Sequence, residues 1–440
     1  MSFDVVIITN GPGELSTWVR PLVSHVYESL PEARIIICLV PCPYASGEED
    51  KVAINFPGVS YLFDVTESSR FLLTKKLPKD FSFNSQGIII HLGGDQFFSV
   101  MMAWRTKFPS LVYTEKWTFW PSVIDKYLLP EQNAYATARL RGIDASKLAV
   151  VGNLMVDAVT SPMPPSEIRE RLALSTLSPV VSLLPGSKAF KVKYSTPFLL
   201  KVADYIARKK PEVQFILSQS PFTPLYQIVG SVASEECISA LDGVSANFGR
   251  SKYGNVLVTD QGTVIDIIPP EFQYESYQVS DVSITLPGTN TAELAILGIP
   301  MVVLMPLNKP EHIPLEGLVG RIADLPWIGK YIKSFLIRRG LKKLKYIALP
   351  NQKLGRMVTP ELVGDISAIE VANQVIGILE SPYQRREISI NLKQSMGASG
   401  AVKNVLANII EVLLKRYPDM EILENFNHFT DWTKRELDTE

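Results

Sequence analysis

Residues 280–304 read SDVSITLPGTNTAELAILGIPMVVL and predict a strand, a turn, a helix and a second strand in immediate succession. The first apolar run ends at Leu286, the turn covers residues 287–290, and an apolar helix follows at once. Two parallel strands joined by a crossover helix form the repeating unit of α/β folds. This stretch therefore predicts the fold class, and its glycine turn is a first candidate binding site.

The same alternation of β-branched runs and helical patterns continues in both directions along the chain. Strands are expected near residues 4–9, 34–40, 87–92, 111–114, 126–129 and 148–152, and again near residues 180–184, 213–218, 255–258, 282–286 and 301–305. Runs that are apolar throughout fit strands buried on both faces of a parallel sheet.

A proline-rich stretch, TSPMPPSE at 160–167, separates two halves of this pattern. We therefore predict an α/β fold with two facing Rossmann-like domains, residues 1–160 and 161–385, followed by C-terminal helices and an acidic tail at 386–440. Ligands of such sheets bind at the carboxyl ends of the strands, so the cleft between the domains is the expected site.

Composition narrows the class of protein. The 440 residues carry a formal charge of -1, with 46% hydrophobic and 20% charged residues, which argues against a disordered chain and against nucleic-acid binding by overall charge. Three cysteines and four scattered histidines form neither a disulfide framework nor a zinc-ligand spacing. The longest weakly charged run, residues 294–308, contains two prolines and is shorter than the roughly 20 residues of a membrane span. We expect no metal, no cofactor, and a soluble or peripherally attached protein.

The turn at 287–290 favours a diphosphate ligand. Amides at a helix start are unpaired donors at the positive end of the helix dipole, and Gly288 permits close approach of a ligand. An alternative interpretation is purely structural, with Asn290 as the helix N-cap and Glu293 as the acid of a capping box.

A second strand, turn and helix are predicted at VVSLLPGSKAFKVK, residues 180–193. Gly186 and Ser187 end the strand, and three lysines follow, at 188, 191 and 193. Amides, a hydroxyl and a cation together can neutralise a diphosphate leaving group without a metal. The alternative is an ordinary turn with solvated lysines. Neither turn has the spacing of a P-loop, which argues against that type of nucleotide site.

Two turns of the first half are further candidates. In residues 10–14, NGPGE, the third glycine of a dinucleotide fingerprint is missing, so an NAD or FAD enzyme is disfavoured, but Gly13 and Glu14 can still meet a substrate. The simpler role of Glu14 is to balance the helix dipole. In GIIIHLGGDQFF, Asp95 is placed to take a proton from an acceptor hydroxyl, whereas His91 is expected to be a packed core residue.

Residues 327–345 carry seven basic and no acidic side chains, interleaved with apolar residues at helical spacing. This pattern favours a segment that lies on an anionic membrane surface. The alternatives are an ordinary domain face and a nucleic-acid contact.

Taken together, four segments resemble the lipid-A-disaccharide synthase family. They are VVGNLMVDAV at 150–159, SLLPGSK at 182–188, SDVSITLPGTNTAELAILGIPMVV at 280–303 and LPNQKLGRMVTPEL at 349–362. The resemblance implies a GT-B glycosyltransferase. It would transfer a GlcNAc-type sugar, with inversion and without a metal, from a UDP donor to a glycolipid acceptor on the cytoplasmic face of the membrane.

The resemblance also implies roles for individual residues. Gly288, Thr289 and Asn290 would hold the diphosphate or uridine side, and Glu293 would accept the ribose hydroxyls. Ser187 and Lys188 would contact the diphosphate, and Asp95 would be the general base. Asn351 and Arg356, in the last segment, are further expected substrate-binding residues, and no separate roles are assigned to them or to Glu361 of the same segment.

The chain departs from the family pattern mainly on its acceptor side. The first turn and the GGDQFF loop differ from the usual sequence of the family. Lys188 stands in place of an arginine, so the two parallel hydrogen bonds of a guanidinium to phosphate cannot form there. These departures favour a different acceptor lipid, and two alternatives stay open: a UDP-GlcNAc 2-epimerase-like isomerase, or a non-catalytic relative that binds sugar nucleotides or lipids. Pairing of the C-terminal helices in a homodimer is also left open.

Overall fold

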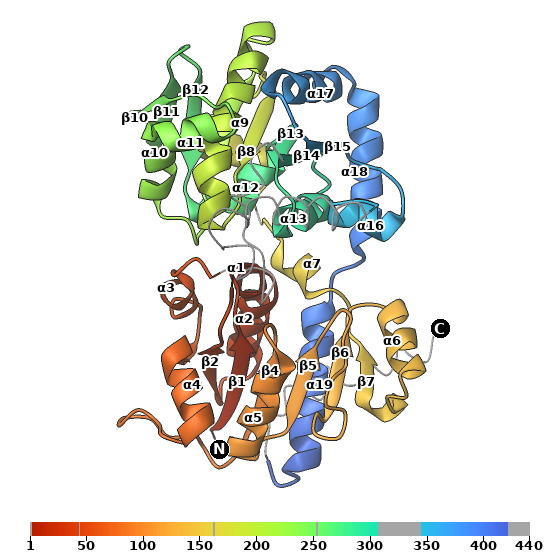
Figure 1. Cartoon of the computed structure of the whole chain (residues 1–440). Coiled ribbons are helices and arrows are strands. Elements are labelled where there is room, and N and C mark those ends of the chain that lie inside the picture. The colour runs from red at the N-terminus through yellow and green to blue at the C-terminus, as the bar shows by residue number, and fades with distance from the viewer. Residues whose placement is uncertain (1, 44, 162, 252–253, 307–344, 421–440) are drawn as a thin grey trace, which may run out of the picture. The chain divides into compact units, whose positions relative to one another are not determined.

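The computed structural model describes residues 2–43, 45–161, 163–251, 254–306 and 345–420, which fold into two units, each around its own sheet (Figure 1). The first unit comprises the chain up to Ala158 together with the stretch that starts at Ala398, and the second runs from Val159 to Gly397. Each unit is α/β, as the sequence predicts. The predicted cleft between the domains stays a prediction.

The sheet of the first unit has seven parallel strands among the described residues, in the order β3-β2-β1-β4-β5-β6-β7. Its strands are β1 Phe3–Thr9, β2 Ala33–Leu39, β3 Val59–Phe63, β4 Gly87–His91, β5 Ser110–Tyr113, β6 Lys126–Leu129 and β7 Leu148–Val150. Its helices are α1 Pro12–Glu14, the π-helical turn η1 Leu15–Val19, α2 Arg20–Ser29, α3 Glu49–Ala53, α4 Val65–Thr74, α5 Gln96–Thr106, α6 Gln132–Leu140, η2 Ala145–Lys147, α7 Leu154–Ala158 and α19 Ala401–Arg416.

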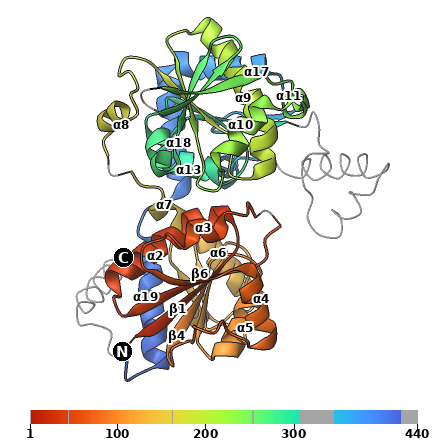
Figure 2. The ribbon, with the colours of Figure 1, turned by 90° about the vertical axis from the view of Figure 1, so that its left-hand side faces the viewer.

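Helices cover both faces of this sheet, which explains why its central strands are apolar throughout. Figure 2 shows α4 and α5 on one face and α2 and α19 on the other. All seven residues of β1 are buried. They include Asp4, whose carboxylate receives two hydrogen bonds from the Arg34 guanidinium on β2, at 2.8 and 2.9 Å. A buried carboxylate is tolerated there because it is paired and hydrogen-bonded.

The described sheet of the second unit has eight strands in the order β10-β11-β12-β9-β8-β13-β14-β15. They are β8 Val180–Leu184, β9 Gln214–Ser218, β10 Ala246–Ser251, β11 Gly254–Thr259, β12 Val264–Ile268, β13 Val282–Thr285, β14 Met301–Pro306 and β15 Glu361–Gly364. The helices are α8 Pro165–Arg171, α9 Ala189–Lys209, α10 Leu225–Ala233, α11 Glu235–Ala240, η3 Pro270–Phe272, α12 Gln273–Gln278, α13 Thr289–Leu297, α16 Leu349–Leu354, α17 Ala368–Glu380 and α18 Pro382–Met396.

One edge of this sheet corrects the expectation of parallel strands throughout. β11 runs antiparallel to both β10 and β12. The reason is the connection between β11 and β12, a four-residue turn in which Gly262 has φ +85°. A turn this short can join only antiparallel neighbours, because a parallel pair needs a long crossover.

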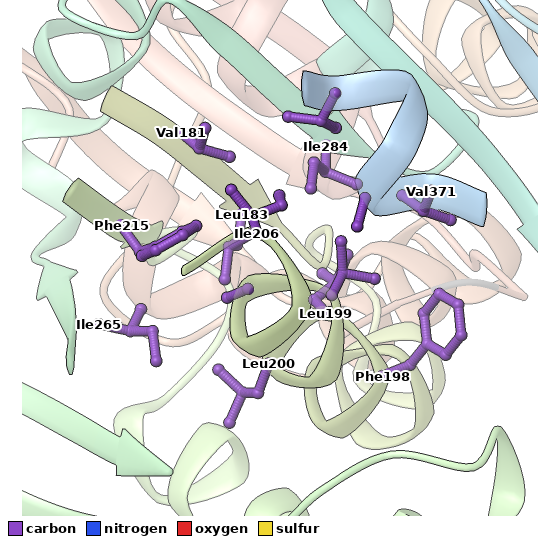
Figure 3. Close-up of a cluster of buried hydrophobic side chains, with 14 of the residues drawn as sticks. Val181, Leu183, Phe198, Leu199, Leu200, Ile206, Phe215, Ile265, Ile284 and Val371 are labelled. Carbon is purple, nitrogen blue, oxygen red and sulfur yellow. The ribbon is translucent and has the colours of Figure 1, made fainter. Parts of the chain in front are cut away.

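The core of the second unit forms where α9 and α17 pack on the sheet. Leu199 and Ile206 of α9 belong to one buried cluster with Leu183 and Ile284 of the strands and Val371 of α17 (Figure 3). Buried residues recur along α9 at intervals of three and four, which is the spacing of one helical face. This packing holds the start of α9 at the end of β8.

The C-terminal helices divide between the units. The structure separates the chain after Ala158 and after Gly397, whereas the sequence placed divisions after residues 160 and 385. α18 packs on α13, α16 and α17 of the second unit, and α19 packs on α2, α7 and β4 of the first. The described residues of the predicted separate part (386–440) are therefore shared between both units.

Among the described residues, the stretch Pro382–Arg416 has the length and hydropathy of a membrane span. It consists of two helices separated by Gly397 and Gly400, both with positive φ. In α19 the apolar residues, such as Val405 and Ile409, are buried within the first unit, so α19 is a core helix there.

Candidate active site

The two glycine turns predicted from the sequence lie at the ends of neighbouring strands. β8 and β13 are parallel, with Thr285 paired to Leu184, so both strands end at the same edge of the sheet. Gly186 has φ +95° and Gly288 has φ +151°, conformations that residues with a Cβ rarely adopt. The structure therefore brings the two candidate phosphate turns together.

Each turn leads directly into a helix without a side-chain cap. α13 begins at Thr289 with Gly288 as its N-cap, so Asn290 is its second residue. The alternative of an Asn290–Glu293 capping box is wrong, because Gly288 occupies the capping position and has no side chain. α9 begins after Lys188, whose side chain makes no capping hydrogen bond, and Ser187 precedes it, half-buried. First-turn amides without a cap can donate to an anion.

Lys191 connects the two turns. Its Nζ donates to the carbonyl oxygen of Pro287 at 2.5 Å. Burial, reinforced by the nearby charge of Lys188, lowers the pKa of Lys191 to about 8. From the sequence, Lys191 is only one of three lysines that follow the turn. Its position in the sequence does not distinguish it from Lys188 or Lys193.

Glu293 lies on the buried side of α13, where it is 2% exposed. The Tyr274 hydroxyl donates to its Oε1 at 3.3 Å, and Gln273 Nε2 lies 3.5 Å from its Oε2. Burial, with the charge of Glu293 as the next cause, raises the pKa of Tyr277 well above its usual value. These two contacts of Glu293 come from α12, and nothing in the sequence had indicated them.

The last family segment forms a self-contained turn between α16 and β15. Asn351 is fully buried, and its side chain bonds the backbone of Val358 and Thr359 and the carboxylate of Glu361 over 2.7–3.1 Å. Arg356 is exposed and donates to Asn391 of α18 at 2.7 Å. These described contacts give Asn351 and Glu361 a structural role next to α13.

In the first unit, the turns after β1 and β4 line one hollow of about 430 Å³. Glu14, His91 and Asp95 all contribute to its wall. His91 is buried, its Nδ1 lies 2.8 Å from the Ser99 hydroxyl, and burial lowers its pKa to about 4. The imidazole is therefore neutral near pH 7, as expected of a packed core residue.

Asp95 is exposed and serves as the N-cap of α5, where Oδ1 accepts from the amide of Phe97 at 2.9 Å. This contact engages one carboxylate oxygen, and the residue still faces the hollow. A proton acceptor in this position is held in place by the helix that it caps.

Glu14 occupies space that two glycines leave open. A Cβ on Gly11 would lie 2.5 Å from Glu14 Oε2, and a Cβ on Gly93 would lie 2.9 Å from its Cγ. Gly13 lies beside Glu14 in α1, and its carbonyl accepts from Thr17 at 2.8 Å. The Glu14 side chain thus explains why Gly11 and Gly93 are glycines.

Trp117 and Phe119 line this hollow and Trp120 follows them in the chain, and sequence reasoning did not single out these residues. Trp117, Phe119 and Trp120 are 54%, 51% and 45% exposed, yet their loop is fixed. Gln96 donates to the Trp117 carbonyl at 2.6 Å and accepts from the Phe119 amide at 3.0 Å. The run WTFW at 117–120, here called the aromatic loop, was the available signal.

One polar group in the wall of the hollow has no partner in the described part of the chain, and two further expectations from the sequence concern metals and the basic segment. The Trp18 indole Nε1 is buried in the wall of the hollow with no hydrogen-bond partner among the described residues. In the same described ranges no group of three or more His, Cys, Asp or Glu side chains could hold a metal ion. The basic segment 327–345 lies outside the described residues except for Lys345.

Comparison with known proteins gives two levels of similarity. No protein-family model matches the chain. Over 275 residues it is 27% identical to the lipid-A-disaccharide synthase of Geobacter sulfurreducens, covering 61% of this chain and 58% of that protein. Over 278 residues it is 24% identical to the same enzyme of Persephonella marina, covering 62% and 60%. The match thus spans about three fifths of these relatives' length.

Solved structures share the fold of nearly the whole chain. The UDP-GlcNAc 2-epimerase of Neisseria meningitidis, bound to UDP-GlcNAc, has a TM-score of 0.55 at 13% identity and covers 93% of this chain and 100% of its own. The epimerase of Methanocaldococcus jannaschii has a TM-score of 0.50, also at 13% identity, with the same coverage. At such identities the likeness shows the fold alone, which is GT-B.

Proposed function

We propose that this chain, which is 27% and 24% identical to two lipid-A-disaccharide synthases over part of its length, is an inverting glycosyltransferase. It moves a GlcNAc-type sugar from a UDP donor to a lipid acceptor at the cytoplasmic face of a membrane. The observation that carries the proposal is the pair of uncapped glycine turns at the ends of β8 and β13.

The second unit is the proposed donor-binding part. The diphosphate lies against the amides that follow Gly186 and Gly288, where the positive ends of α9 and α13 converge. Glu293 accepts hydrogen bonds from the ribose hydroxyls, and the hydrogen bond from Tyr274 orients its carboxylate. Ser187 and Lys188 lie next to the first turn and complete the anion site.

The first unit is the proposed acceptor-binding part. Its hollow combines carboxylates with the unpartnered Trp18 N–H, groups that suit a hydroxyl-bearing head group. The aromatic loop and its flanking cations suit the lipid side. Arg141 lies 4.6 Å from the centre of the Trp117 ring, and tryptophan with arginine or lysine is typical of a membrane interface.

The proposed reaction needs one proton acceptor and one stabilised leaving group. The acceptor hydroxyl oxygen forms a bond to the anomeric carbon while the bond from that carbon to the UDP oxygen breaks. Asp95 takes the hydroxyl proton, and the electron pair leaves with the diphosphate, which the turn amides and a lysine stabilise. Attack opposite the leaving group inverts the anomeric centre.

Lipid analysis tests this function. Mass spectrometry of cells with and without the protein should reveal one glycolipid whose mass differs by an N-acetylhexosamine. Purified protein should release UDP from UDP-GlcNAc only when that lipid acceptor is present. Formation of the 2-epimer without any acceptor would instead identify an epimerase. Normal UDP binding with no turnover on any acceptor would identify a non-catalytic binding protein.

A further inference from the structure

Lys191 is distinguished from the other two lysines of its segment by where its side chain runs. Its stem passes Gly186, where an added Cβ would lie 3.4 Å from Cδ of the lysine. Its ammonium ends beside Gly288, where an added Cβ would lie 3.5 Å from Nζ. One side chain therefore spans from the first glycine turn to the second.

The neighbouring charges do not neutralise this ammonium. Lys193 and Tyr194 turn away, and both donate to Glu236 of α11, at 3.0 and 3.2 Å. From α13, Glu293 is engaged by α12 on the buried side. None of the ion pairs among the described residues includes Lys191, and the one charged group that shifts its pKa is the cation Lys188.

A cation held in this way is unfavourable in the free protein. Burial penalises its charged form, the like charge of Lys188 adds to the penalty, and the Pro287 carbonyl offsets only part of it. An anion bound between the turns would remove the penalty, and a partly desolvated contact between ammonium and phosphate is strong. The arrangement therefore favours a bound dianion over the empty site.

We propose that Lys191 is the principal cation for the diphosphate of the UDP donor and contacts it from between the two turns, whereas Lys188 has a secondary role. This inference rests on the proposed function. It also accounts for the change from arginine to Lys188 in the family pattern, because a second cation three residues later compensates for the missing guanidinium fork at position 188.

Calorimetry with UDP and with uridine on the full chain tests this assignment. Lys191→Met should raise the Kd for UDP by about tenfold or more and leave the Kd for uridine unchanged, because uridine carries no phosphate. Lys193→Met, a matched control whose ammonium pairs with Glu236, should bind UDP like the wild type.

Two results would overturn the assignment: unchanged UDP binding by Lys191→Met, or an equally large loss with Lys188→Met alone. If the wild type itself fails to bind UDP, the proposed function fails instead. Should Lys191→Met not fold, acetylation of lysines in the wild type supplies the answer. UDP should protect Lys191 from the reagent and uridine should not, and equal labelling with and without UDP contradicts the proposal.

Discussion

The Tyr274 hydroxyl lies 3.3 Å from Oε1 of Glu293, so a carboxylate on one helix is oriented by a phenol on another. Orientation by a buried partner means that the side chain is already placed before any ligand arrives. It also means that a change at either residue is expected to alter ligand binding more than it alters the course of the backbone.

Glu293→Ala should weaken binding of UDP and of uridine by about 1–3 kcal/mol each, because both ligands carry the ribose whose hydroxyls the carboxylate accepts. Isothermal calorimetry measures both. Tyr274→Phe, which removes only the orienting hydroxyl, should give a smaller loss of the same kind. Unchanged uridine affinity in Glu293→Ala would refute the ribose assignment.

Asp95→Asn should reduce transfer about 10²- to 10⁴-fold while preserving α5, because asparagine caps a helix as well as aspartate but does not accept a proton. The rate of UDP release in the presence of the acceptor is the measurement. Asp64→Asn is a matched control, since Asp64 caps α4 of the same unit by accepting from Glu67 at 2.7 Å. Equal rates for both variants would leave Asp95 with a capping role alone.

Replacing Trp117 and Phe119 together by serine should lower binding to vesicles of phosphatidylglycerol and phosphatidylethanolamine at least about tenfold, because each buried aromatic side chain contributes roughly 1.5–3 kcal/mol. Co-sedimentation measures this binding. Leu177→Ser serves as the control, since Leu177 is 93% exposed on the second unit. A separate variant, with Lys342, Lys343 and Lys345 replaced by glutamine, tests the contribution of the basic segment in the same assay. Retention of full binding by the serine variant would exclude the aromatic loop as a lipid contact.

UDP affinity should be nearly constant between about pH 7 and pH 8, above the range in which the phosphate of UDP takes up a proton, and should fall above pH 8. Burial lowers the pKa of Lys191 to about 8 in the free protein, and a bound diphosphate raises it again by favouring the protonated form. Above its free-state pKa, binding must take up a proton, so the Kd rises about tenfold per pH unit until the pKa of the complex is reached. This phase should be absent in Lys191→Met and in titrations with uridine.

Asp157→Ala should destabilise α19. The Asp157 carboxylate on α7 accepts from the amides of Gly400 and Val402, both at 2.7 Å, and so caps a helix that carries no cap of its own. Loss of these charged hydrogen bonds should lower hydrogen-exchange protection of α19 about 10- to 100-fold. The exposed Asp80→Ala should leave it unchanged. Unaltered protection in Asp157→Ala would show that packing alone holds α19.

Prediction from sequence succeeded where residues repeat a simple pattern. The strand expected at 180–184 is β8, since its five residues are all apolar or small and all buried. The structure also contains β10, which the sequence did not indicate, because ANFGRS is largely exposed at the sheet edge and has no apolar run. β15 was not predicted for a similar reason, since three of its four residues are half-buried and one is exposed.

The candidate site shows the same division. Turn residues such as Gly186 and Gly288 are visible as motifs, because positive φ demands glycine. The role inferred for Lys191 depends instead on the direction of its flexible side chain. The role of Tyr274 depends on a contact with Glu293, which lies 19 residues further along the chain. Neither relationship leaves a local pattern.

The return of the chain from the second unit to the first has a consequence for biosynthesis. A ribosome that has completed Ala158 has produced every described strand of the first sheet but not α19, which together with α2 covers one face of it (Figure 2). The part of that face that α19 covers stays exposed until more than 200 further residues, the whole second unit, have emerged. The first 158 codons therefore encode an unfinished domain, and α19 completes it.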